Sequence, residues 1–120
     1  MKLIITLIKK YWFIITVFLL TAIATLSLWP AEHLPQVPGS DKTHHFISYG
    51  ILMLPLALQK PKHWLWIALG FASFSGAIEI IQPYVNRYGE WLDMAANVAG
   101  LSCGLLFATV IEYLMRSNTK

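Results

Sequence analysis

Four long apolar runs, separated by short polar joints, constrain this chain more than any other feature. The runs cover residues 11–29, 45–58, 64–81 and 93–115. Because a helix rises about 1.5 Å per residue, residues 11–28 span roughly 27 Å, close to the ~30 Å hydrocarbon core of a bilayer. With 57% hydrophobic and 12% charged residues, the chain has too little polar surface to cover a soluble globule. The sequence therefore predicts a polytopic, all-α membrane protein with four spanning helices.

The helices are expected at residues 11–29, 43–59, 64–82 and 92–115. The second run is short and contains Pro55, which removes a backbone donor from the helix. We expect a kinked or thin span that Thr43 and Gln59 extend into the two interfaces.

A secretory signal peptide is the alternative interpretation of the first run. Lys2, Lys9 and Lys10 would form its basic start. The apolar stretch is longer than the ~7–15 residues of a signal peptide's hydrophobic h-region, however, and no small-residue cleavage site follows it before Pro30. We therefore expect a retained helix.

Charged residues are distributed unevenly between the two sides of the predicted bundle. One side holds seven of the nine basic residues: Lys2, Lys9, Lys10, Lys60, Lys62, Arg116 and Lys120. The other holds five of the six acids, together with Lys42 and Arg87: Glu32, Asp41, Glu79, Glu90 and Asp93. The positive-inside rule therefore places both termini in the cytoplasm. Such dispersed anchors do not indicate a nucleic-acid partner.

One domain is expected to cover residues 1–120, as an antiparallel four-helix bundle. The tight turn at residues 59–63 makes the second and third helices antiparallel neighbours. The proline-rich joint at residues 30–40 cannot continue a helix and should run extended along the outer surface.

Small residues recur every four positions in the last two runs. They are Ala68, Ala72 and Gly76 in the third run and Ala96, Gly100, Gly104 and Ala108 in the fourth. Such stripes allow two helix backbones to approach closely in a membrane. We expect the third and fourth helices to pack along them; a homodimer face is the alternative.

Polar side chains gather at the predicted outer ends of three helices. They share a helix face within each group: Asp41, His45 and Tyr49 on the second helix, Glu79 and Gln82 on the third, and Asp93 and Asn97 on the fourth. A charge at the centre of a bilayer costs about 2.5–3.5 kcal/mol, so Glu79 and Asp93 should face the bundle interior or a wet cavity. We expect the three groups to form one outward-facing site.

Each of these residues also has a purely structural interpretation. Asp41 is a suitable N-cap, and Asp93 in the first turn of a helix complements the helix dipole. His45 alone can be satisfied by Asp41, and Glu79 alone can join two helices. The convergence of three separate groups is what favours a functional site.

Three ordered motifs resemble those of the VanZ-like family of small bacterial membrane proteins. They are Asp41-Lys42-x-x-His45-Phe46-x-x-Tyr49, Glu79-x-x-Gln82 and Arg87-x-x-Glu90-x-x-Asp93-x-x-x-Asn97-x-x-Gly100. The resemblance covers residues 41–104. It implies a multi-pass protein of the bacterial inner membrane that acts at the cell envelope, because the founding member is associated with teicoplanin resistance. It also marks Asp41, Lys42, His45, Glu79, Gln82, Arg87, Asp93 and Asn97 as motif positions.

The first functional hypothesis is a binding or accessory protein that interacts with membrane lipid. Its pocket would hold an anionic lipid-linked phosphate or a glycopeptide-related ligand. Lys42 and Arg87 would attract the anion, as would the positive dipole ends of the second and fourth helices.

The second hypothesis is a membrane-embedded hydrolase or transferase. His45, Glu79 and Asp93 would be its catalytic candidates, either as ligands of a divalent metal cofactor or with Glu79 as general base and His45 as acid. A proton-coupled transporter is the third and least supported hypothesis, because only Ser73, Ser75 and Ser102 continue a polar path inward.

Overall fold

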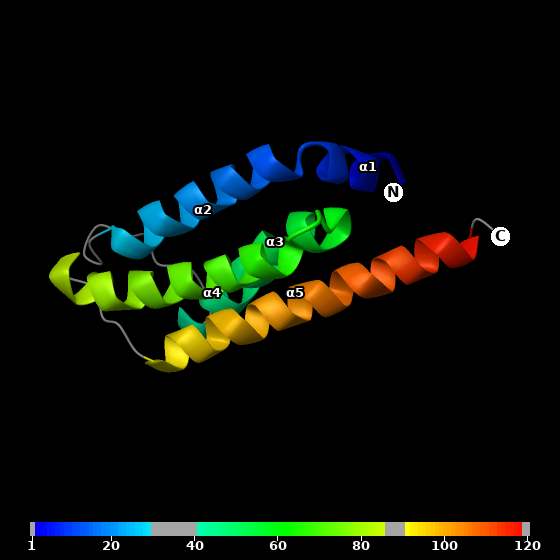
Figure 1. Cartoon of the computed structure of the whole chain (residues 1–120). Helices are drawn as coiled ribbons and strands as arrows, with labels where there is room; N and C mark the ends of the chain where they lie inside the picture. The colour runs from blue at the N-terminus through cyan, green and yellow to red at the C-terminus, as the bar shows by residue number, and fades with distance from the viewer. Residues whose placement is uncertain (1, 30–40, 86–90, 119–120) are drawn as a thin grey trace.

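The structure is a computed structural model that describes residues 2–29, 41–85 and 91–118 (Figure 1). These residues form five α-helices and a short 3-10 helix: α1 (Lys2–Lys10), α2 (Trp12–Leu28), α3 (Asp41–Gln59), α4 (Trp64–Ile81), η2 (Gln82–Val85) and α5 (Trp91–Asn118). The all-α expectation is confirmed. The joint at residues 30–40, expected to run extended, lies outside the described residues.

The N-terminal region differs from the sequence prediction, because a second helix precedes the expected one. The axes of α1 and α2 differ by 78° at the break between them. Ile5 of α1 is buried, and Lys9 Nζ lies 2.6 Å from Glu112 Oε1 in α5. Helix α1 packs mainly against α3, and the ion pair joins it to the C-terminal half of α5, so the basic start of the chain is part of the folded protein.

Two helical segments are long and apolar enough to cross a membrane by themselves, namely Trp64–Tyr84 and Trp91–Ser117. The bent pair of α1 and α2 adds a third if it counts as one span. The expected span at residues 43–59 is not among them, although α3 does form there. Its N-terminal half carries Lys42, His44 and His45, which lower its hydropathy.

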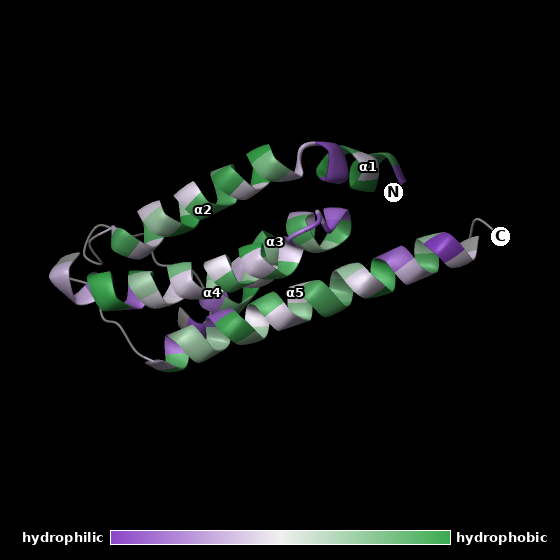
Figure 2. Cartoon of the chain, viewed as in Figure 1, coloured by the Kyte–Doolittle hydropathy of each residue, from purple (hydrophilic) through white to green (hydrophobic). Residues whose placement is uncertain are grey.

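Helix α3 is the central helix of the protein and contacts each of the other four α-helices. Its buried side chains include Leu52, Met53 and Leu56. Large apolar side chains are instead exposed on the surrounding helices, such as Phe18 on α2 and Phe107 on α5. Figure 2 shows hydrophobic residues along both of these helices. An apolar exterior of this extent is typical of a protein that sits in lipid. Helix α3, the least apolar of the long helices, is thus the one that the other helices cover.

Glycines bring α3 and α5 closer together than any other pair of helices. A Cβ atom added at Gly104 would lie 2.5 Å from the carbonyl oxygen of Gly50 and 3.0 Å from Met53 Cβ. One added at Gly100 would overlap the carbonyl oxygen of Phe46. The backbones of α3 and α5 are therefore in direct contact.

The prediction that the stripes of the third and fourth runs pack on each other is therefore wrong. The glycines of α5 face Gly50 of α3, a residue that belongs to neither predicted stripe. Between α4 and α5, a Cβ added at Gly76 would lie 3.4 Å from the methyl carbon of Met94. A long side chain fills the space there, so the two backbones stay apart.

Helices α3 and α5 run parallel, because Gly100 meets Phe46 and Gly104 meets Gly50. Helix α4 folds back from α3 through the turn at residues 60–63 (Figure 1). Lys60 closes α3 in a left-handed conformation with φ 44°, and its N–H donates to the carbonyl of Leu56 at 2.7 Å. The tight turn expected there is confirmed. The N-terminal ends of α3 and α5 therefore meet the C-terminal end of α4.

Candidate functional site

Polar side chains from α3, α4 and α5 meet where these three helix ends come together. Glu79, Asp93 and Asn97 are each at most 6% exposed. The His45 side chain is 13% exposed. We refer to six residues as the polar cluster: Lys42, His45, Ser75, Glu79, Asp93 and Asn97. Every polar side chain of the set except Lys42 is withdrawn from the protein surface.

A chain of hydrogen bonds links the three helices inside the polar cluster. His45 Nδ1 lies 2.9 Å from Asn97 Oδ1, and Asn97 Nδ2 donates to Ser75 Oγ at 2.6 Å. Because an amide oxygen only accepts hydrogen bonds, His45 Nδ1 is the donor of the first bond. In the neutral imidazole, Nε2 then carries the lone pair. Asn97 thereby sets both the ring orientation and the tautomer of His45.

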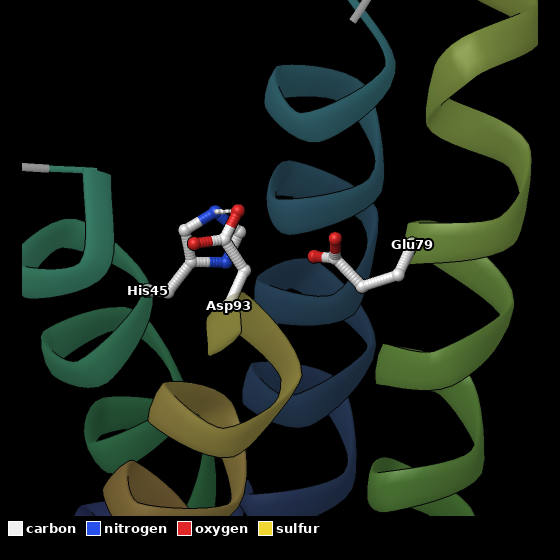
Figure 3. A group of neighbouring side chains, drawn as sticks. All are labelled: His45, Glu79 and Asp93. Atoms are coloured by element: carbon white, nitrogen blue, oxygen red, sulfur yellow. Dashed lines mark ion pairs between the residues drawn. The ribbon is translucent and has the colours of Figure 1, made fainter. Parts of the chain in front are cut away.

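The other ring nitrogen of His45 faces the carboxylates. Nε2 lies 4.0 Å from Asp93 Oδ2. Figure 3 shows the carboxylate of Glu79 directed toward His45 and Asp93. One donor atom from each of the three residues lies within 4.8 Å of the other two. One imidazole and two carboxylates are a donor set that can hold a divalent metal.

Lys42 reaches the polar cluster from its solvent-accessible side. Its Nζ lies 3.7 Å from Asp93 Oδ1, and its side chain is 47% exposed while that of Asp93 is 7% exposed. The ion pair therefore joins an accessible cation to a buried anion. Lys42 is the cluster residue best placed to meet a ligand that arrives from outside.

Two further predicted site residues lie beside the polar cluster. The Tyr49 side chain is buried next to Ser75 and Glu79. Gln82 is also buried, and its Nε2 donates to the carbonyl oxygen of Ser27 at 3.1 Å. Gln82 thus joins the end of α4 to the end of α2.

The side chains of two predicted site residues are not described by the structure, and one residue of the polar cluster was not predicted. Arg87 and the side chain of Asp41 lie outside what the structure describes. Ser75, in contrast, belongs to the polar cluster but was not a predicted site residue. Its signal was present in the sequence, because it precedes Glu79 by four residues and so shares its helix face.

Comparison with known proteins gives one match. A family model described as VanZ/LLP1 matches residues 3–112, nearly the whole chain. The matched region contains every residue of the polar cluster and also α2, which carries none of the motifs noted in the sequence. No curated protein and no solved structure matches.

Proposed function

This chain belongs to the VanZ/LLP1 family, and we propose on that premise that it binds an anionic ligand at a bacterial membrane. The ligand is a lipid-linked phosphate or a related glycopeptide component of the cell envelope. The polar cluster is its binding site. One observation carries the proposal: an accessible Lys42 lies over a buried polar site at the N-terminal ends of two parallel helices.

The proposed arrangement in the membrane is an antiparallel bundle of α2, α3, α4 and α5. The distribution of charge supports it, because basic residues lie near the start of α2, in the turn after α3 and at the end of α5: Lys9, Lys10, Lys60, Lys62 and Arg116. By the positive-inside rule this end is cytoplasmic in the inner membrane, and the polar cluster opens to the outer side. Helix α3 crosses despite its polar residues because its neighbours cover it.

The electrostatics at the N-terminal ends of α3 and α5 favour an anionic group. Each helix N-terminus carries the equivalent of roughly half a positive charge and has free N–H groups. Lys42 adds a full charge with three hydrogen-bond donors. Its Nζ lies 3.7 Å from Asp93 Oδ1 at the site, and the Lys42 side chain is 47% exposed.

Binding of a polyprenyl phosphate to the purified full chain in nanodiscs tests the proposal. We expect Lys42→Ala to weaken binding at least tenfold. Lys62→Ala, which removes an exposed lysine in the turn before α4, should leave binding unchanged. Equal affinity of the two variants would refute Lys42 as the binding residue, and no binding by the unmodified chain would refute a lipid-linked phosphate as the ligand.

A cellular experiment tests the proposed role in glycopeptide resistance. Expression of the chain in a teicoplanin-sensitive bacterium should raise the tolerated concentration, and the Lys42→Ala variant should remove most of this gain. Direct titration of the nanodiscs with teicoplanin separates the two ligand sources. Binding of teicoplanin but not of the polyprenyl phosphate would assign the site to the antibiotic.

A further inference from the structure

We propose that the polar cluster holds a divalent transition-metal ion, Zn²⁺ or Mn²⁺. The ligands are His45 Nε2, one carboxylate oxygen of Glu79 and one carboxylate oxygen of Asp93. This inference goes beyond the proposed anion binding, because it assigns a resident cofactor from the arrangement of these three side chains. It stands whether or not a lipid or a glycopeptide binds above it.

The three donor atoms are already close to the spacing that a metal requires. One donor atom from each of the three side chains lies within 4.8 Å of the other two, and the distance between His45 Nε2 and Asp93 Oδ2 is 4.0 Å. Around an ion with metal–ligand distances of about 2.1 Å, neighbouring donors lie roughly 3.0–3.4 Å apart. Each side chain needs to move inward by less than about 1 Å. Small side-chain rotations supply a movement of this size without a change in the helices.

The orientation of His45 is the one that metal-bound histidines have. Such a histidine normally donates its other ring N–H to a carbonyl or carboxylate oxygen, which leaves the coordinating nitrogen unprotonated. Here Nδ1 donates to Asn97, and Nε2 faces the carboxylates. Asn97 is itself held by Ser75 and is fully buried. These hydrogen bonds orient His45 so that its Nε2, which has no hydrogen bond among residues 2–29, 41–85 and 91–118, faces Asp93.

Asp93 provides the second, independent observation. Its side chain is 7% exposed, and among the described residues Oδ1 accepts no hydrogen bond. Lys42 Nζ lies 3.7 Å from Oδ1, toward the surface. Buried carboxylates normally have close hydrogen-bond partners or coordinate a metal. A dication between Asp93 and Glu79 offsets the charge of both.

The donor set decides which metals fit. Imidazole favours Zn²⁺ and other late transition metals, while carboxylates also suit Mn²⁺. Three protein ligands leave at least one coordination position, as in zinc sites that bind a water or a substrate oxygen. Lys42 Nζ lies 3.7 Å from Asp93 Oδ1, one of the two carboxylates in the proposed donor set. A phosphate oxygen bound to the metal would therefore be near Lys42.

Metal titration of the full chain, without any lipid ligand, tests the inference. The chain is purified in detergent, treated with a chelator, and titrated with Zn²⁺ and with Mn²⁺ by calorimetry. We expect one ion per chain. Asp93→Asn and Glu79→Gln should each weaken binding at least 100-fold. Glu112→Gln, which changes an α5 acid paired with Lys9, should leave binding unchanged.

Pulsed electron paramagnetic resonance of the Mn²⁺-loaded unmodified chain gives a result that does not depend on variants folding. One coordinated imidazole nitrogen should be detected, and His45→Ala should remove its signal. No stoichiometric metal, a metal without nitrogen coupling, or full affinity in Asp93→Asn would each overturn the inference. Because no lipid is present, such a failure leaves the test of anion binding unaffected.

Discussion

Replacing Gly100 by alanine is expected to force α3 and α5 apart. The added methyl group would overlap the carbonyl oxygen of Phe46 and lie 3.1 Å from its carbonyl carbon and 3.2 Å from the nitrogen of Gly50. All three atoms belong to the backbone, so no side chain can rotate away. Favourable separations of non-bonded heavy atoms are about 3.5–4.0 Å. The helices must therefore separate by about 1 Å at this point.

The cost follows from the same contacts. Overpacking of this kind costs about 1–3 kcal/mol. The separation also reaches the polar cluster, because Asn97 precedes Gly100 by one helical turn and bonds to α3 through His45 at 2.9 Å. Moving α5 away by about 1 Å would stretch that bond to roughly 3.9 Å, beyond hydrogen-bonding distance. Gly100→Ala should thus lower both stability and ligand or metal affinity.

Gly70→Ala is the matched control for this experiment. Gly70 also lies within a helix, but a Cβ added there has nothing within 4 Å. Both substitutions gain the same helix propensity, about 0.5–1 kcal/mol, so the difference between them isolates the packing cost. We expect Gly100→Ala to be less stable than Gly70→Ala by about 1–3 kcal/mol. Reversible unfolding in mixed micelles, followed by circular dichroism, measures this difference.

The result that would refute the reasoning is equal stability of Gly100→Ala and Gly70→Ala. It would mean that the backbones of α3 and α5 are not in contact at Gly100. Gly76→Ala gives a second comparison, since its nearest atom is the flexible end of Met94 at 3.4 Å. This variant should behave like Gly70→Ala, and a large loss of stability there would place the close contact between α4 and α5 instead.

Three further predictions concern the polar cluster and the attachment of α1. Asn97→Leu removes the hydrogen bonds to His45 and Ser75, so both of these side chains lose a partner. It should lower the free energy of unfolding by about 2–4 kcal/mol in the same micelle assay. Lys9→Ala should lower the free energy of unfolding by at most about 1 kcal/mol, because the Lys9 and Glu112 side chains are 34% and 25% exposed and water weakens their ion pair. The loss should be smaller in high salt, which unfolding measured at several salt concentrations checks. A metal at 100 times its dissociation constant should raise the free energy of unfolding by about 2.7 kcal/mol, as measured by melting with and without the metal.

Much of the polar cluster could be predicted from the sequence, because its members occur in local groups. Asp93 and Asn97 are four residues apart, and helical geometry alone puts them on one face. The high cost of charge in a membrane then indicates that Asp93 faces the interior. The contribution of Ser27 could not be predicted, because it bonds to Gln82 through a backbone carbonyl that every residue has.

The pairing of helices could not be predicted for a different reason. The stripe on α5 was visible in the sequence, but its partner on α3 is the single Gly50. Small residues show that a close contact exists without showing which helix makes it. Four spans were predicted, but among the described residues two helical segments, or three if α1 and α2 count as one span, are long and apolar enough to cross a membrane. The polar residues in the N-terminal half of α3 lower its hydropathy.

The sequence by itself determined that the chain is helical, that its outside is apolar, and that polar side chains lie at the ends of three helices. These properties depend on residues within a few positions of one another, where 3.6 residues per turn fixes the geometry. Only the tertiary structure decided that His45 bonds to Asn97 and that α3 lies against α5. Such contacts join residues about 50 positions apart. They depend on how two complete surfaces fit together, and no local pattern specifies that fit.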